Sequence, residues 1–215
     1  MTPIYNPLDK IHLGENVRDA LLRQPVVAMP PSQRFAGAGI YALYCTGDFA
    51  AYEKLVERNR RGCFEAPIYV GEAVPEGSRK GGLLAQQKPT SKLYSRLREH
   101  AKSIGQTTNL RIEDFHFRCL VVDDIWIPLG EALMIDTFAP VWNKLIDGFG
   151  IHTPGKNRPQ TMSAWDVLHP GRAFVTKAKL LSNPKSHTDL IEEVRRHLAL
   201  PRVKQSRVPT VEEGR

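Results

Sequence analysis

Residues 37–47, GAGIYALYCTG, decide the fold, because this apolar run between glycines predicts one buried strand. A similar stretch, APIYVGEA at residues 66–73, predicts a second strand. Side chains alternate along a strand, so Tyr41 and Tyr69 would share one face of the sheet if the two strands pair. A glycine two positions from each tyrosine removes bulk and would let a backbone or a phosphate approach. The simpler alternative is that both tyrosines are ordinary amphipathic residues at a strand edge.

Two helices and a third strand complete a small core. Residues 91–104, SKLYSRLREHAKSI, predict a helix that the side chain of Ser91 caps. Residues 114–123, DFHFRCLVVD, predict a strand, and residues 128–138, PLGEALMIDTF, predict a helix that begins at its proline. The order strand, strand, helix, strand, helix indicates an α/β (α+β) fold with a three-stranded sheet.

The rest of the chain predicts extensions on both sides of this core. We expect an N-terminal arm over residues 1–36, with a short helix, and the core with inserted loops over residues 37–145. Residues 146–200 are expected to form a C-terminal extension that wraps the core and contains an amphipathic helix. Residues 201–215 are polar, and we expect them to be disordered.

The composition favours an anionic partner in a reducing compartment. The 215-residue chain carries a formal net charge of +7, which favours nucleic acid first and a membrane surface second. Its three cysteines are widely spaced and form no CxxC motif, which argues against a disulfide framework and a zinc site. The first residues lack the apolar run of a signal peptide, and no stretch is long and apolar enough to span a bilayer. We therefore expect a soluble intracellular protein.

The helix predicted at residues 91–104 carries two basic side chains that can be interpreted in two ways. Arg96 and His100 are four residues apart, so they would project from one face, which differs from the face of Leu93 and Leu97. An arginine holds a phosphate through two donors, and a neighbouring histidine accepts or relays a proton. The alternative is a solvated basic helix face.

Glu131 and Asn143 are the remaining candidates for a site. Glu131 is expected in the first turn of the helix predicted at residues 128–138, where a carboxylate is stabilised by the positive end of the helix dipole. It would also serve as one hard oxygen ligand for Mg²⁺, which often takes only one or two carboxylates in addition to water and phosphate oxygens. Asn143 follows that helix and would otherwise be a loop residue or a helix terminator.

The order of these motifs resembles the GIY-YIG nuclease superfamily. Its two name-giving motifs stand here as Gly39-Ile40-Tyr41 and Tyr69-Val70-Gly71, with valine in place of the middle isoleucine of the second. The segments GAGIYALY, PIYVGEAVP, RLREH, TTNL, GEALMI, PVWNKLIDGFGIHTPG and SAWDVLHPGR are similar to the Type II restriction endonucleases of this superfamily that cut the palindrome CCGCGG. The resemblance covers most of residues 35–172. It implies a mainly antiparallel sheet flanked by helices, and a Mg²⁺-dependent endonuclease with a single metal ion.

The resemblance also implies how a proton would be removed from the attacking water. Tyr41 would act as the general base or orient the water, and Tyr69 would position the water or the scissile phosphate. A tyrosine with its ordinary pKa near 10 is a poor base at neutral pH, so a neighbour must accept its proton. His100 is the candidate, although many superfamily members instead place a lysine near the first tyrosine. A role for His100 that only holds Tyr41 in place is the alternative.

Three further roles follow from the resemblance. Arg96 would bind the scissile phosphate and stabilise the transition state. Glu131 would hold one Mg²⁺ that also contacts the leaving oxygen. Asn143 would support the site through hydrogen bonds.

The sequence also carries candidate DNA contacts. A site made of G·C pairs needs Arg or Lys donors to guanine and acceptors for cytosine N4, whereas phosphate contacts only position the protein. Residues 79–111 are basic, and the loop HTPGKNRPQ at residues 152–160 adds further donors. The candidates for DNA binding are Arg79, Lys80, Lys92, Lys156, Asn157 and Arg158.

A palindromic target implies particular partners. One active site per chain on a palindrome implies a two-fold homodimer with one cut per strand. A restriction role also requires a cognate DNA methyltransferase in the same system to protect the host, and it places the protein in the bacterial cytoplasm. The alternatives are a repair or homing nuclease of the same superfamily, a DNA-binding module without activity, and a basic RNA-binding protein, for which the aromatic-rich strands of common RNA modules are missing.

Overall fold

An antiparallel sheet forms the centre of the molecule in the computed structural model, which describes residues 6–75, 90–151, 161–178 and 180–200. The strand order is β1-β4-β2-β3, and every neighbouring pair is antiparallel. The strands are β1 (Val27–Ala28), β2 (Gly39–Cys45), β3 (Tyr69–Ala73) and β4 (Phe115–Val121). The predicted α/β (α+β) class with a mainly antiparallel sheet is confirmed.

The predicted number of three strands is wrong, because the N-terminal arm supplies a fourth. Strand β1 pairs with β4 in the register Val27↔Phe117 and Ala28↔His116. Both of its residues are exposed, and prolines lie close on either side of it at Pro25 and Pro30. A two-residue exposed strand carries no alternating pattern, so the sequence offered no signal for it.

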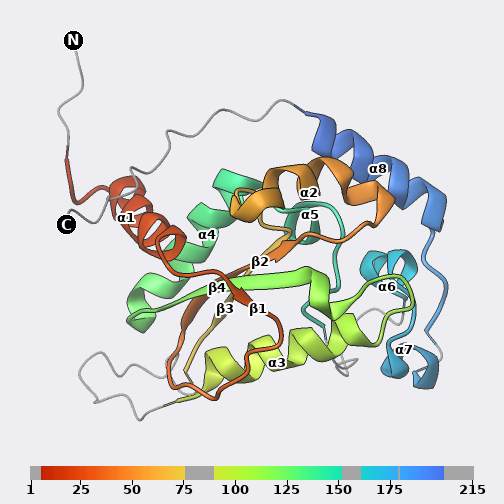
Figure 1. Ribbon diagram of the computed structural model, residues 1–215, viewed down its shortest axis with the longest axis horizontal. Helices are drawn as coiled ribbons and strands as arrows, with labels where there is room; N and C mark the ends of the chain where they lie inside the picture. Colours follow the sequence, from red (N-terminus) through yellow and green to blue (C-terminus); the bar gives the residue numbers. More distant parts are fainter. Residues whose placement is uncertain (1–5, 76–89, 152–160, 179, 201–215) are drawn as a thin grey trace.

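Helices cover both faces of the sheet (Figure 1). Helices α1 (Lys10–Leu22) and α4 (Ile127–Phe138) lie on one side, and α3 (Lys92–Gly105) lies on the other. Helices α2, α5, α6 and α8 join the core on the α3 side, because apolar residues of each belong to the same buried cluster as those of α3. The remaining helices are α2 (Glu53–Asn59), α5 (Val141–Lys144), α6 (Ala164–Leu168), α7 (Ala173–Lys177) and α8 (His187–Ala199), with short 3-10 turns at Ala50–Tyr52, Arg60–Gly62, Ile112–Asp114 and Asp124–Trp126.

Strand β2 is buried along its whole length, because it has a strand on each side and helices on each face. Its alternation divides the interior into two cores. Tyr41 and Leu43 pack with α3, whereas Ile40, Ala42 and Tyr44 pack with α1 and α4. Successive side chains of this strand therefore enter opposite cores, as the geometry of a β-strand requires.

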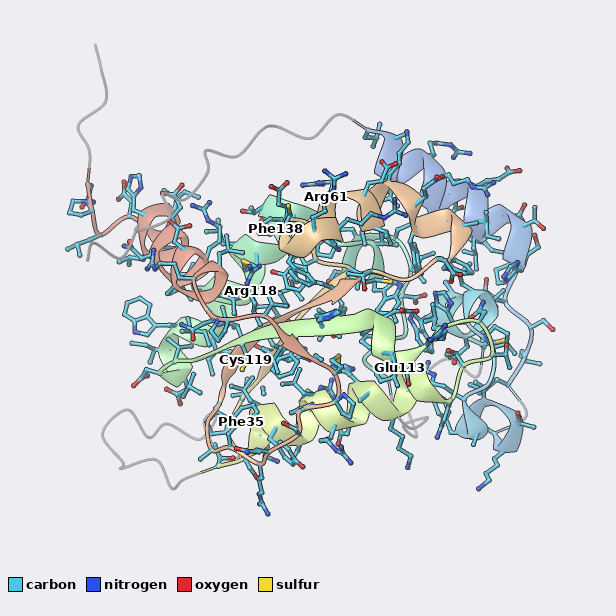
Figure 2. The ribbon with its side chains drawn as sticks, in the orientation of Figure 1. Phe35, Arg61, Glu113, Arg118, Cys119 and Phe138 are labelled. Carbon is cyan, nitrogen blue, oxygen red and sulfur yellow. The ribbon has the colours of Figure 1, made fainter. Side chains whose placement is uncertain are left out.

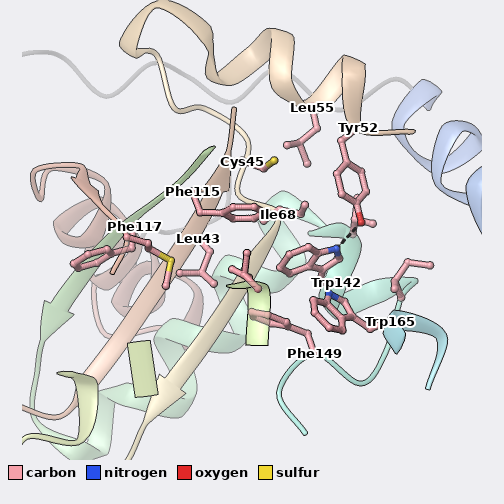
Figure 3. Packing of buried hydrophobic residues seen from close by; sticks show 14 of the residues in the cluster. Leu43, Cys45, Tyr52, Leu55, Ile68, Phe115, Phe117, Trp142, Phe149 and Trp165 are labelled. Atoms are coloured by element: carbon pink, nitrogen blue, oxygen red, sulfur yellow. Dashed lines mark hydrogen bonds between the residues drawn. The ribbon is translucent and has the colours of Figure 1, made fainter. Parts of the chain in front are cut away.

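The core on the α3 side is rich in aromatic residues. Figure 3 shows Trp142, Phe149 and Trp165 grouped closely together, and their rings are tilted or edge-on to one another. The ring centroids of Trp142 and Phe149 are 4.4 Å apart, and those of Phe149 and Trp165 are 5.2 Å apart. On the same side of the sheet, Phe35 packs edge-on against α3, whereas Arg118 lies on the α1 side (Figure 2).

Two expectations about helix ends are wrong. Ser91 precedes α3, but its side chain caps no backbone N–H and instead accepts a hydrogen bond of 3.0 Å from Arg34. Helix α4 begins at Ile127, so Glu131 lies beyond its first turn, which contains no acidic residue. The helix starts earlier than its proline because a 3-10 turn at Asp124–Trp126 leads directly into it.

The boundaries of the predicted arm, core and C-terminal extension remain predictions. In the part of the chain that the structure describes, no helix has the length and apolar character needed to cross a membrane. The tail at residues 201–215 lies outside the described residues.

Candidate active site

The centre of the candidate site is a buried Tyr–His pair. The Tyr41 hydroxyl lies 2.6 Å from His100 Nε2, and both side chains are fully buried. Tyr41 comes from the middle of β2 and His100 from α3, which lies on this face of the sheet. His100 is buried together with Leu93 and Leu97, so the prediction of a separate helix face is wrong for His100.

Tyr69 lies beside this pair, on the same face of the sheet as predicted. Its ring centroid is 6.2 Å from that of Tyr41 and 5.3 Å from that of His100. Gly71 lies directly opposite Tyr41 in the β2–β3 register, and a Cβ at this glycine would overlap the Tyr41 hydroxyl. The space that the glycine leaves is therefore filled by the tyrosine itself, not by a backbone or a phosphate.

Arg96 lies one turn before His100, at the border between the interior and solvent. About a third of its side chain is exposed, at 33%. Its Nη1 donates to Glu99 at 3.2 Å, and its Nη2 donates to the Gly150 carbonyl at 3.3 Å. The position gives one guanidinium access to both the buried tyrosines and solvent, as phosphate binding requires.

The environment disfavours a tyrosinate at Tyr41. Burial raises the pKa of Tyr41 well above its ordinary value, and Tyr69 and Glu131 act in the same direction. The charge of Arg96 and its side-chain hydrogen bond to Tyr41 lower the pKa but do not outweigh burial. Burial also raises the pKa of Tyr69. Tyr41 can therefore accept a proton only if it passes its own proton on.

Glu131 of α4 provides the negative charge of the site. Loss of solvent and, to a smaller extent, the neighbouring Glu72 raise the pKa of this carboxyl to about 7, against the opposing charge of Arg96. A partly buried carboxylate next to another carboxylate is destabilised, and a bound cation would relieve that cost. A single hard oxygen donor is also what Mg²⁺ uses when phosphate oxygens and water supply its other ligands. The residues present thus fit the metal.

Asn143 of α5 binds the outer edge of β3. Its side-chain oxygen accepts from the Val70 N–H at 2.8 Å, and its amide donates to the Val70 carbonyl at 2.8 Å. These two hydrogen bonds imitate a neighbouring strand. They fix the backbone of the residue that follows Tyr69.

The family model of the Eco29kI GIY-YIG domain matches residues 33–198 of the chain. The chain belongs to this family. It is therefore a nuclease with a GIY-YIG restriction endonuclease domain, and such a domain binds DNA. No curated protein matches the chain significantly.

The structure brings together the six residues predicted for catalysis in this Eco29kI-type domain: Tyr41, Tyr69, Arg96, His100, Glu131 and Asn143. Tyr69, Arg96 and Glu131 interact with the Tyr41–His100 pair, whereas Asn143 binds the backbone of Val70, the residue after Tyr69. Among the predicted DNA contacts, Lys92 is the first residue of α3 and is half-buried. The others, Arg79, Lys80, Lys156, Asn157 and Arg158, lie outside the described residues.

The structure adds a neighbour that the sequence did not single out. Phe149 stacks on the His100 ring, with a centroid distance of 4.5 Å and an interplanar angle of 16°. Within the Eco29kI-type domain this phenylalanine belongs to the stretch IDGFGI at residues 146–151. A phenylalanine between two glycines reads as a loop residue, so no sequence pattern pointed to it.

Proposed function

We propose that the protein is a Type II restriction endonuclease that hydrolyses phosphodiester bonds in double-stranded DNA at a GC-rich palindrome, CCGCGG. The observation that supports it best is the 2.6 Å contact between the Tyr41 hydroxyl and His100 Nε2, beside the part-exposed guanidinium of Arg96. This arrangement offers a proton acceptor and a phosphate-binding group next to each other, which hydrolysis of a phosphodiester needs.

Proton removal would proceed through both members of the pair. The attacking water gives its proton to the Tyr41 oxygen while the Tyr41 proton passes to His100 Nε2. Arginine only donates hydrogen bonds, so the bond with Arg96 leaves the Tyr41 proton to be directed at the histidine. The concerted transfer avoids a free tyrosinate, which burial makes unfavourable.

Arg96 and Tyr69 would bind the reacting phosphate. Arg96 neutralises the negative charge that builds on the non-bridging oxygens in the transition state, and its bond to Gly150 holds it in place. Tyr69 orients the water or the phosphate from the other side of Tyr41. Glu131 would hold one Mg²⁺, which supplies Lewis-acid stabilisation of the developing charge. Asn143 keeps β3, and with it Tyr69, in register.

The same proposal includes the partners. A palindrome cut once in each strand implies a homodimer. The basic residues that flank the site would bind phosphates or guanines, and a methyltransferase of the same system would protect the host DNA.

Digestion of plasmid DNA by the purified protein with Mg²⁺, followed by sequencing of every new end, tests the proposal. The matched control is Glu131→Ala, and a plasmid without CCGCGG serves as the substrate control. Ends confined to CCGCGG and lost in the variant are the expected result. Scattered ends would instead indicate a nuclease of the repair kind. Salt-sensitive DNA binding without any cleavage would indicate a DNA-binding module.

A further inference from the structure

A second charged cluster is buried next to the candidate site, within the segment at residues 146–200. It consists of Arg172, Asp166 of α6, and the loop at residues 147–151. Arg172 is only 1% exposed and Asp166 only 4%, so the pair is out of reach of solvent and of DNA. Such a pair needs a structural reason, because replacing a buried ion pair with apolar residues is often neutral or stabilising.

Arg172 uses all of its donors within this cluster. A guanidinium has five N–H groups. Two bonds go to the Asp166 carboxylate, at 2.6 Å from Nε and 2.7 Å from Nη2. Three bonds go to main-chain carbonyls of the loop, those of Gly148 at 3.0 Å, Phe149 at 3.3 Å and Ile151 at 2.6 Å. One side chain therefore determines the path of the loop.

Helix α6 holds the same loop from its other end. The Trp165 N–H donates to the Asp147 carbonyl at 2.9 Å, and the Ala164 N–H donates to the Asp147 side chain at 3.2 Å. The Trp165 ring also lies under the guanidinium of Arg172, 4.5 Å from its central carbon. Gly148 adopts φ +101°, where a Cβ would overlap Ser163. The loop is thus held by both Arg172 and helix α6.

This loop contacts three residues of the candidate site. Phe149 stacks on His100 and meets Tyr69 edge-on at a centroid distance of 5.0 Å. The Gly150 carbonyl accepts the Arg96 bond, and a Cβ at Gly150 would come within 3.1 Å of the Tyr69 hydroxyl. In Figure 3, Phe149 and Trp165 lie side by side below Trp142, so the loop sits between α6 and the site.

We propose that Arg172 is a positioning residue for this nuclease, with Asp166 as its partner. Arg172 donates three hydrogen bonds to main-chain carbonyls and so fixes the conformation of the loop at residues 147–151. This loop in turn orients His100 and Arg96. The inference rests on the proposed function, because it assigns an effect on cleavage to a residue that touches neither DNA nor the reacting atoms.

The decisive variant is Arg172→Lys. Lysine keeps the charge opposite Asp166 but lacks the planar fork, so it cannot bind the carboxylate and three carbonyls together. The matched control is Tyr52→Phe, which removes a buried hydrogen bond with His169 on the far side of Trp142. Both variants are compared with wild type by urea unfolding, by affinity for a CCGCGG duplex in Ca²⁺, and by single-turnover cleavage of that duplex with Mg²⁺.

We expect the single-turnover rate of Arg172→Lys to fall by about 100-fold with duplex affinity within threefold of wild type, because small misplacements of catalytic groups cost about that much. Tyr52→Phe is expected to lose stability while its rate stays within about threefold. If both rates fall only in proportion to the fraction of protein unfolded, Arg172 has a merely structural role and the inference is wrong.

A second readout separates this inference from the proposed function. The imidazole ¹H and ¹⁵N resonances of His100 report on the Phe149 ring stacked on it, with or without DNA cleavage. We expect these resonances to shift in Arg172→Lys and to stay in place in Tyr52→Phe. If wild type cleaves no DNA but the shift occurs, the proposed function fails and the positioning stands. Unchanged His100 resonances in Arg172→Lys would refute the positioning whatever the protein cleaves.

Discussion

Among the residues that the structure describes are two buried Tyr–His pairs with the same hydroxyl-to-imidazole distance. The Tyr41 and Tyr52 hydroxyls each lie 2.6 Å from a histidine Nε2, of His100 and His169 respectively. All four side chains are fully buried. Trp142 lies between them, because its ring packs on Phe149 next to His100 and also on His169.

The Tyr52–His169 pair belongs to a closed chain of hydrogen bonds. The Trp142 indole can only donate, and it donates to the Tyr52 hydroxyl at 2.7 Å (Figure 3). Tyr52 therefore donates to His169 Nε2, and His169 Nδ1 donates to the Asn109 side-chain oxygen at 3.0 Å. Burial and the nearby His187 lower the pKa of His169 to about 3, so this histidine stays neutral.

The Tyr41–His100 pair has different neighbours. Charged Arg96 and Glu131 both act on Tyr41, and Arg96 reaches solvent. The difference teaches that a short Tyr–His contact is not in itself a catalytic signature. The Tyr52–His169 pair is hydrogen-bonded to the neutral side chains of Trp142 and Asn109, whereas the Tyr41–His100 pair lies beside the charges that a phosphate and a cation need.

Matched substitutions of the two tyrosines give the largest expected difference. Tyr41→Phe removes the oxygen proposed to accept the water's proton, so we expect cleavage to fall by about 10³-fold. Tyr52→Phe leaves that oxygen intact and is expected to lower the free energy of unfolding by about 1–3 kcal/mol, because the Trp142 and His169 partners lose a buried bond. Single-turnover cleavage and urea unfolding of both variants measure the two effects.

Equal losses of cleavage in the two tyrosine variants would contradict the distinction between the pairs. The purified proteins should also give the same circular dichroism at the assay temperature, so that unfolding does not imitate a catalytic defect.

A fall in pH should lower the stability of the protein mainly through the Tyr52–His169 pair. The pKa of His169 is lower in the folded than in the unfolded state, so its contribution to stability is present above pH 6.5 and is lost as the pH falls toward 3. Between pH 7.5 and 4.5 we expect a loss of roughly 2–3 kcal/mol from this residue. Urea unfolding across that range should show it, and His169→Asn should remove most of the slope. A slope that is unchanged in His169→Asn would show that other groups cause the acid sensitivity.

The contribution of Glu131 to stability should have the opposite pH dependence, and this effect is the smallest of those predicted. Its pKa is raised to about 7 in the folded protein, so the ionised carboxylate costs stability as the pH rises from about 4.5 through 7. Glu131→Gln should therefore stabilise the metal-free protein by about 1 kcal/mol at pH 8, a value reduced for partial exposure, and by nothing at pH 4. Unfolding in EDTA measures this gain. A variant less stable than wild type at pH 8 would contradict the raised pKa.

Local sequence patterns predicted strands β2, β3 and β4 and the face that Tyr41 and Tyr69 share. They did not predict features that depend on contacts between residues far apart in the sequence. Alternation along β2 is a property of neighbouring residues, so the shared face of Tyr41 and Tyr69 could be predicted. The burial of His100 depends on how α3 lies on the sheet, and helix spacing alone gave the wrong face. Arg172 is the extreme case, because nothing local distinguishes a fully buried arginine from a surface one.

The resemblance to a known family contributed what the patterns could not. The motifs around the two tyrosines, Arg96 and Glu131 are ordinary one by one, and only their order indicated a nuclease. The strand in the N-terminal arm was missed because it lies in no motif. The support from residues 147–151 was missed because the resemblance covers this segment without giving its residues a role.

The two hydrogen bonds from Asn143 to Val70 have a consequence for assembly. Strand β3 ends the sheet, and an unprotected end strand offers its backbone to any other strand that can pair with it. Here the outward groups of Val70 are taken by Asn143, and the Ile68 carbonyl is taken by the Trp142 N–H. A second copy of the chain that continued its sheet across this end of β3 would have to displace these hydrogen bonds. The end of β3 that carries Tyr69 is thereby protected against edge-to-edge aggregation.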